Sequence, residues 1–200
     1  MTSPRSNGEI KAQSLYSTTK RALAFYDKQM LSFLNQAMQD FILRQEMVFI
    51  ATSDGTGECD SSFRAGLPGF VRVLDDKTLI YPEYRGNGVM ASIGNLLENK
   101  NIGMMFIDFF ESTVGLHVNG SAQIIENYQL LAYSNLPVSI FSDLATKGGR
   151  KPERWIKVSV YEAYVHCSKH LPLLAKLDKK IYWGTDKSSH KGGDYFGVSA

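Results

Sequence analysis

The chain opens with a helical pattern of apolar residues. Over residues 20–45 they recur at three- and four-residue spacing, and polar side chains fall between them. The apolar positions are Met30, Phe33, Leu34, Ala37, Met38, Phe41 and Ile42. We therefore predict one amphipathic helix over this range, with its apolar face packed on the core.

Beyond residue 45 the pattern changes to short apolar or alternating runs between turn residues, which indicates β-strands. We predict strands over residues 47–52, 59–63, 70–74, 78–81, 101–110, 114–126 (with a bulge at Gly120) and 155–165, a helix over 92–99, a short helix over 128–134 and a loop-rich insertion over 137–154. About six or seven short antiparallel strands fit a barrel better than alternating βαβ units. The predicted fold is mainly β with helices, a six-stranded antiparallel split β-barrel behind an N-terminal amphipathic helix.

Composition limits the class of protein. With 200 residues and 44% hydrophobic content, the chain can bury one core, so we expect a tail over residues 1–19, one domain over 20–185 and a polar end over 186–200. That end is either a tail or is docked through Tyr195 and Phe196. The net charge of +2 comes from mixed signs, so we expect no nucleic-acid partner. Two cysteines, and no apolar leader or spanning segment, lead us to expect a reduced, cytoplasmic protein without a membrane partner.

The stretch KTLIYPEYRGNGVMASIGN, residues 77–95, is the strongest candidate for a binding site. We expect Pro82 to end the strand ladder, and Gly86 and Gly88 to let the backbone beside Asn87 approach a ligand. Arg85 can contact two phosphate oxygens at once, and a helix that opens near Val89 would add free backbone N–H groups. The string lacks both the dinucleotide fingerprint and the nucleotide P-loop ending. From the residues alone it is either an anion site or an ordinary strand-to-helix turn.

Three segments carry a resemblance to a known family: CDSSFRAGLPGFVRVLDD, YPEYRGNGVMASIGNLLENKNIGMMFIDF and VGLHVNGSAQII. Over residues 25–183 the chain resembles flavin-binding split-barrel proteins related to pyridoxamine 5'-phosphate oxidase. The resemblance implies FMN as cofactor, with its phosphate at the loop and its ring beside the end of the preceding strand. By position it implies these cofactor-binding residues: Ser61, Ser62, Arg64, Tyr81, Pro82, Arg85, Gly86, Asn87, Ser92, His117 and Lys169.

The chain also departs from the oxidase itself. The oxidase loop carries a Ser-Arg-Lys run, and its end carries an Arg-x-His-Asp-Arg type motif for the substrate phosphate. This chain instead ends IYWGTDKSSHKGGDYFGVSA, so we do not expect pyridoxal phosphate synthesis.

Histidines and a lysine leave further alternatives open. His117 lies two positions from Asn119 on a strand, so it either faces a partner's flavin or is a barrel histidine with a hydrogen-bond partner. Lys169, in HCSKH, either favours an anionic reduced flavin or is a surface lysine. Because Cys59 and His190 give no paired ligand motif, we expect no metal site.

The function that follows is an FMN-dependent oxidoreductase that acts on a small organic molecule. A flavin carries the redox chemistry itself, so no catalytic residue is implied beyond those that hold it. The resemblance also implies a homodimer with each flavin at the subunit interface. The alternatives are a non-catalytic flavin- or haem-binding protein, with His117, His166 or His170 as an iron ligand, and a deazaflavin-dependent reductase.

Overall fold

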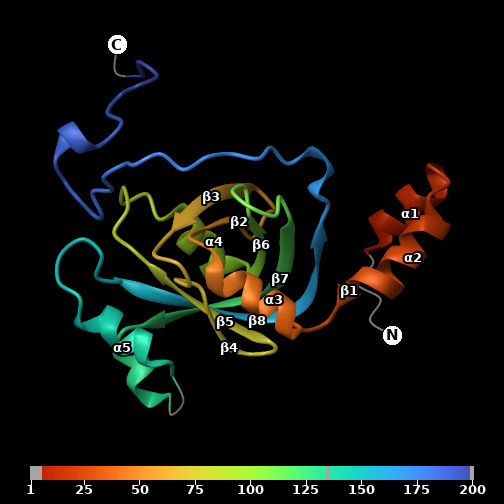
Figure 1. Cartoon of the computed structure of the whole chain (residues 1–200), viewed down its shortest axis with the longest axis horizontal. Helices are drawn as coiled ribbons and strands as arrows, with labels where there is room; N and C mark the ends of the chain where they lie inside the picture. The colour runs from red at the N-terminus through yellow and green to blue at the C-terminus, as the bar shows by residue number, and fades with distance from the viewer. Residues whose placement is uncertain (1–5, 134–135, 199–200) are drawn as a thin grey trace.

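Two long antiparallel strands, β7 (Gly115–Glu126) and β8 (Arg154–His166), run through the middle of the sheet (Figure 1). The computed structural model describes residues 6–133 and 136–198. Within these residues the sheet has eight strands, in the order β3-β2-β6-β7-β8-β5-β4 with β1 paired to β8. The sheet curls into a barrel, and its edge strands β3 and β4 are not paired with each other. The predicted fold class is confirmed, with more strands than the six expected.

The remaining strands are short, and all but the first lie close to predicted strands; the first falls within the segment predicted as helix. They are β1 (Met30–Leu31), β2 (Met47–Ser53), β3 (Cys59–Ala65), β4 (Arg72–Asp75), β5 (Thr78–Glu83) and β6 (Asn101–Ile107). In β2, Val48, Ile50 and Thr52 are buried, while the residues between them are partly or fully exposed. This alternation places one face of each strand in the barrel interior.

The predicted bulge at Gly120 is confirmed. The register between β7 and β8 shifts between Asn119 and Gly120. A Cβ atom at Gly120 would lie 2.5 Å from the carbonyl oxygen of Ser159, so only glycine fits there.

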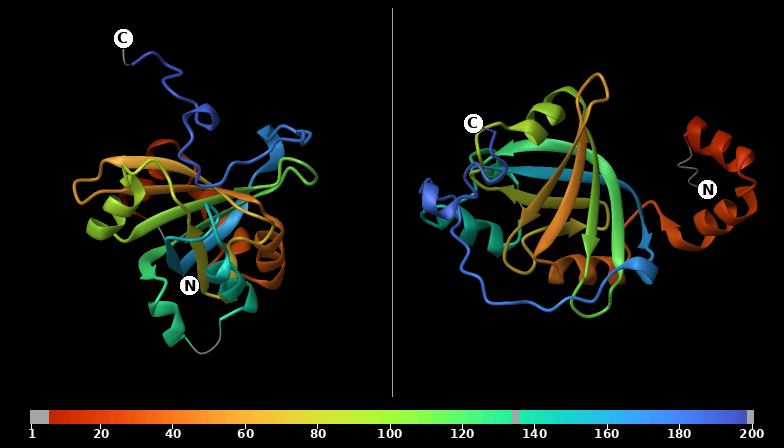
Figure 2. Two further views of the ribbon diagram at one scale, coloured as in Figure 1. Left: turned by 90° about the vertical axis from the view of Figure 1, so that its left-hand side faces the viewer. Right: turned by 90° about the horizontal axis from the view of Figure 1, so that it is seen from above.

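The chain also forms helices, of which the first two stand away from the barrel as a pair (Figure 2). The helices are α1 (Asn7–Leu15), α2 (Thr19–Gln29), α3 (Gln36–Arg44), α4 (Ala91–Glu98) and α5 (Val138–Ala145), with 3-10 helices η1 (Gln129–Ala132), η2 (Ser168–His170) and η3 (Ser188–His190). The main core lies inside the barrel, and a second apolar cluster around Trp155, Ile140 and Leu130 lies under α5. Within the described part, no helix is both long and apolar enough to cross a membrane.

The single helix predicted over residues 20–45 was wrong. The chain forms α2, pairs Met30 and Leu31 with β8, and starts again as α3. Asn35 caps the second helix, because its side chain accepts a hydrogen bond from the backbone N–H of Met38 at 3.0 Å. Leu34 is fully buried, and its N–H donates a hydrogen bond to the carbonyl oxygen of Asp76. The non-helical segment before α3 therefore still places an apolar side chain in the core.

Two other segments differ from expectation. Residues 7–15, expected as part of a tail, form α1, and residues 1–5 lie outside the described part. Residues 138–145, expected as a loop, form α5, which buries Ile140. The short helix predicted over 128–134 is η1, and Ser134 lies outside the described residues.

After β8 the chain runs back across the barrel as an extended strap, residues 171–186 (Figures 1 and 2). Tyr195 and Phe196, through which docking was one of the two alternatives, are exposed and contact each other. The strap docks through Trp183 instead, whose ring lies 5.5 Å from that of Tyr84.

Candidate functional site

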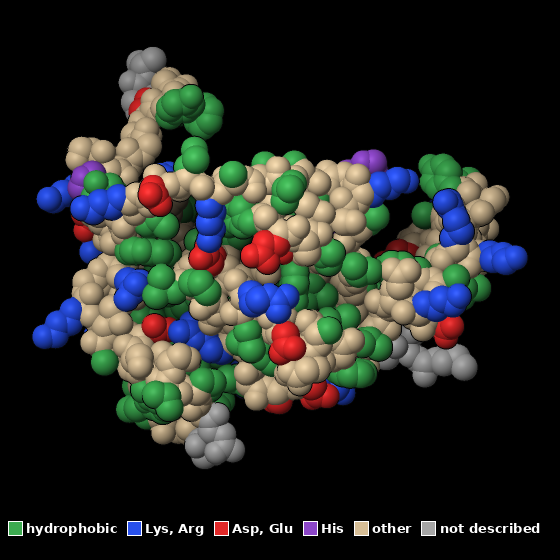
Figure 3. Space-filling view, viewed as in Figure 1, with side chains coloured by type: hydrophobic (Ala, Val, Ile, Leu, Met, Phe, Trp, Pro, Cys, Tyr) green, Lys and Arg blue, Asp and Glu red, His purple; other side chains and the backbone are tan. Residues whose placement is uncertain are grey.

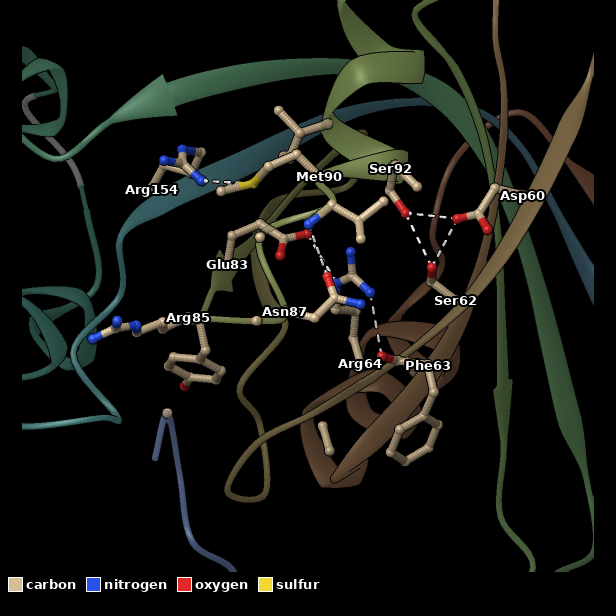
Figure 4. A pocket seen from close by; sticks show the side chains of 18 of the residues that line it. Asp60, Ser62, Phe63, Arg64, Glu83, Arg85, Asn87, Met90, Ser92 and Arg154 are labelled. Carbon is tan, nitrogen blue, oxygen red and sulfur yellow. Dashed lines mark hydrogen bonds and ion pairs between the residues drawn. The ribbon is translucent and has the colours of Figure 1, made fainter. Parts of the chain in front are cut away.

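A cavity of about 580 Å³ opens between β3, the loop from β5 to α4, the start of β8 and the strap (Figure 4). Lys and Arg side chains lie on both sides of this face, toward the C-terminal end and over α1 and α2, and acidic side chains lie among them (Figure 3). The polar and charged side chains that line the cavity are Asp60, Ser62, Arg64, Glu83, Arg85, Asn87, Ser92 and Arg154. This size lies within the range typical of small-molecule sites.

Arg64 and Glu83 form an ion pair in the cavity wall. The Arg64 Nε atom lies 2.9 Å from Glu83 Oε1, and the two side chains are 22% and 10% exposed. Burial raises the pKa of the Glu83 carboxyl, and the neighbouring Arg64 guanidinium opposes that rise. Arg64 also donates to the carbonyl oxygen of Phe63. Its guanidinium is thus held in place by the protein itself.

Asp60, Ser62 and Ser92 form a hydrogen-bonded group at another part of the cavity wall (Figure 4). Both hydroxyls donate to Asp60 Oδ2, at 2.9 and 3.1 Å, and the two hydroxyl oxygens are 3.1 Å apart. The carboxylate orients both serines toward itself. This corner therefore favours a ligand group that donates hydrogen bonds over an anion.

The glycine-containing loop has the open backbone that the sequence predicted. Gly88 has φ +88°, and a Cβ atom at Gly86 would meet no heavy atom within 4 Å. The Asn87 carboxamide accepts a hydrogen bond from Val89 N–H at 3.0 Å, so Asn87 shapes the loop with its oxygen, and its amide donor has no partner among the described residues.

The helix after this loop starts at Ala91, between the predicted opening near Val89 and the predicted range of 92–99. Its N-cap residue Met90 is in the left-handed region, with φ 59°, and forms no side-chain cap. The first N–H groups of α4 have no partner within the helix, and they lie beside the cavity. The loop and the helix start together supply the neutral donors of an anion site.

Two further arginines line the cavity. Arg85 Nη2 lies 2.8 Å from Asp186 Oδ2 of the strap, and both side chains are more than half exposed. Arg154, at the start of β8, lies 3.6 Å from Glu153 and 3.8 Å from Glu126. The cavity thus gathers three guanidinium groups, each with a carboxylate nearby.

The sequence itself places the chain in a family. A sequence model described as pyridoxamine 5'-phosphate oxidase matches residues 34–167, more than half of the chain. The chain belongs to the pyridoxamine 5'-phosphate oxidase family. The matched range includes every strand from β2 to β8, the loop and α4. A search of curated proteins finds no match.

Solved structures of similar fold include three from bacteria. HupZ of group A Streptococcus is 25% identical to this chain; the alignment covers 64% of this chain and 89% of HupZ, with a TM-score of 0.46. An FMN-binding protein of Syntrophomonas wolfei is 14% identical, with 76% and 96% covered and a TM-score of 0.45. HutZ, a haem storage protein of Vibrio cholerae, is 15% identical, with 66% and 94% covered and a TM-score of 0.43. The family assignment rests on the sequence model, since these scores are low.

Six of the residues that the family resemblance implied line this cavity: Ser62, Arg64, Arg85, Gly86, Asn87 and Ser92. Ser61 does not line it. Successive residues of a strand point to opposite faces, and its neighbours Asp60 and Ser62 both point into the cavity, so Ser61 points away from it. The same rule explains a missed residue. Asp60 shares the face of Ser62 and Arg64, so alternation along β3 could have identified it.

Tyr81 and Pro82 lie beneath the cavity and do not line it. Tyr81 is fully buried, burial raises the pKa of its phenol, and its hydroxyl has no hydrogen-bond partner within the described part. Pro82 does not end the ladder, since it pairs with Trp155 and the strand continues to Glu83. β4 begins opposite Ile80, so one edge of β5 is open at Pro82, where a missing N–H is tolerated.

His117 and Lys169 lie away from the cavity within one chain. His117 Nε2 lies 2.8 Å from His166 Nδ1, and its ring stacks on Tyr164 at 4.7 Å. Lys169 lies on η2, after the end of β8. Their roles in a flavin site remain predictions that require a second subunit. Glu83, Arg154 and Trp183 line the cavity but were not predicted as site residues, and no local motif marks them.

Proposed function

We propose that the cavity binds FMN and that the protein is an FMN-dependent oxidoreductase acting on a small organic molecule. One observation carries this: the Arg85 to Gly88 loop leads directly into an uncapped helix start, inside a cavity that also contains Arg64 and Arg154. In a chain of the pyridoxamine 5'-phosphate oxidase family, such a donor set fits a phosphate ester.

The residues also fit the rest of the cofactor. Asp60 offers an acceptor, which suits the imide N–H of an isoalloxazine ring better than a phosphate. FMN would supply the hydride or electron transfer when bound. The chain's own part is to hold the phosphate at the loop, orient the ring and limit the access of water.

A homodimer is part of the proposal. Strand register places Phe63, Phe49, Met105, His117 and Tyr164 in one row across five strands. Phe63 is 53% exposed and also lines the cavity, so a second subunit packed on this row would meet the cavity at Phe63. Such packing would form a shared site to which His117 of a second copy contributes.

The first experiment is the absorbance spectrum of freshly purified protein, followed by FMN titration and a reduction assay with nicotinamide donors. Bound FMN should give flavin bands and raise the melting temperature. Protein that stays colourless, and whose melting temperature does not change with FMN, would exclude the proposal. A Soret band on addition of haem, without flavin uptake, would replace it with the haem-binding alternative.

A variant then tests the loop. Arg85→Ala should weaken FMN binding by about 1.5 to 3 kcal/mol if the guanidinium makes a charge-assisted phosphate contact. Lys191→Ala is the matched control, because Lys191 also approaches Asp186, at 3.6 Å, but does not line the cavity. Equal affinities of the two variants would remove Arg85 from the site. For the dimer, dilution to monomer should release the flavin, and a monomer that retains FMN would contradict the shared site.

A further inference from the structure

The strap is anchored near the start of its course over the barrel. The Leu174 N–H donates to the carbonyl oxygen of Phe109 at 2.8 Å. The Lys176 ammonium pairs with Glu46 and lies 5.3 Å from the ring centroid of Phe110. Beyond these contacts the strap runs toward the loop between β5 and α4, which lines the cavity (Figure 1).

At the cavity the strap backbone lies against the loop that follows α5. A Cβ atom at Gly149 would lie 1.8 Å from the Trp183 carbonyl oxygen, and one at Gly184 would lie 2.6 Å from the Gly149 carbonyl oxygen. Gly184 also has φ +54°, which favours glycine. Only this glycine pair permits the approach that makes Trp183 and Gly184 part of the cavity wall.

Beyond this contact the strap places a carboxylate on the loop arginine. Asp186 Oδ2 lies 2.8 Å from Arg85 Nη2, and Lys191 lies on the other carboxylate oxygen at 3.6 Å. The Arg85 and Asp186 side chains are 56% and 62% exposed, so water and salt screen the pair and it exchanges easily. The guanidinium that would receive a ligand anion therefore already has an anionic partner from the same chain.

We propose that Asp186 is an internal competitor for the loop arginine: a ligand anion must displace it from Arg85, and a phosphate does so better than a carboxylate. A ligand carboxylate that displaces Asp186 exchanges one singly charged group for another and gains little. A phosphate monoester carries a charge of about −1.5 to −2 at neutral pH and three acceptor oxygens, so its exchange for Asp186 is favourable. The glycine contact and the Trp183 ring hold the strap in place during this exchange. This role rests on the proposed FMN function.

The test compares FMN with riboflavin, which has the same ring but no phosphate. Dissociation constants for both are measured in wild type, Asp186→Asn, Arg85→Ala and the double variant, at low and high salt. Asp178→Asn is the matched control, since Asp178 lies on the same strap and forms no ion pair within the described residues.

Asp186→Asn should bind FMN about two- to fivefold more tightly, the size of an exposed ion pair, and riboflavin unchanged. The gain should shrink at high salt and disappear in the Arg85→Ala background. If the wild type binds FMN but Asp186→Asn binds it equally or more weakly, the role of Asp186 is overturned and the proposed function stands. Wild-type protein that binds neither flavin would remove the proposed function and this role with it.

Discussion

The Arg64–Glu83 ion pair gives a stability prediction that needs no ligand. Arg64→Ala would leave the Glu83 carboxylate, which is 10% exposed in the wild type, without its ion-pair partner. Removal of one partner of a buried pair costs about 3 to 5 kcal/mol, and we expect about 3 here because Arg64 is 22% exposed and water reaches the pair. For a chain of this length that loss lowers the melting temperature by about 6 to 12 °C.

The pH dependence separates charge burial from simple loss of packing. Burial holds the folded-state pKa of Glu83 above its unfolded value. The folded state therefore binds the proton more readily, and the free energy of unfolding falls as pH rises through the folded pKa. Loss of Arg64 raises this pKa further, so the variant should lose more stability at pH 7 than at pH 5.

Urea unfolding of Arg64→Ala, Glu83→Gln and the double variant at both pH values measures this. Glu83→Gln removes the buried charge and should cost less than Arg64→Ala. The double variant should recover most of the Arg64→Ala loss, because no unpaired carboxylate remains. Additive losses in the double variant, or an Arg64→Ala loss that is independent of pH, would refute the reasoning.

Three further predictions concern other parts of the chain. Tyr81→Phe should leave stability unchanged or raise it by about 1 kcal/mol in urea unfolding, because the buried hydroxyl has no partner within the described part; a clear loss would show a bound partner. Burial and the neighbouring histidine lower the pKa of His117, so stability should fall as pH drops from 7 through that lowered pKa, and His117→Gln should flatten this slope in a pH series of thermal melts. Gly149→Ala should push Trp183 off the barrel and speed tryptic cleavage of the strap, whereas Gly192→Ala, which has open space around it, should not.

Local pattern predicted the strands well because alternation and turn residues are local signals. The hairpin of β2 and β3, the bulge at Gly120 and the helix α4 lie where the sequence placed them. The break before α3 was missed because helical spacing continues through Met30 and Leu34 even though the chain there pairs with β8. That pairing joins residues more than 130 positions apart, so no local window contains it.

The residues of the site also fall into those that local sequence predicts and those that tertiary contacts place there. The loop residues were predicted because a short string with Arg85 and two glycines has a chemical meaning by itself. Arg154 and Trp183 come from segments far along the chain and enter the cavity only through the β5–β8 pairing and the strap. Their positions follow from tertiary structure and not from any motif.

The ion pairs of the cavity determine which arginines are available to bind a phosphate. Arg64 is mostly buried, and its partner Glu83 is more buried still, so a ligand that separates them would strand a carboxylate in the wall. Arg85 and Asp186 are exposed, and their pair exchanges at little cost. The carboxylates nearest to Arg154, those of Glu153 and Glu126, lie 3.6 and 3.8 Å from its guanidinium, so neither pair is tight. The phosphate of FMN is therefore expected at the Arg85 and Arg154 side of the cavity, with Arg64 retained as the group that keeps the wall neutral. An Arg85→Ala loss of FMN affinity, with an Arg154→Ala loss of similar size, would agree with this division, while losses confined to Arg64 variants that still fold would contradict it.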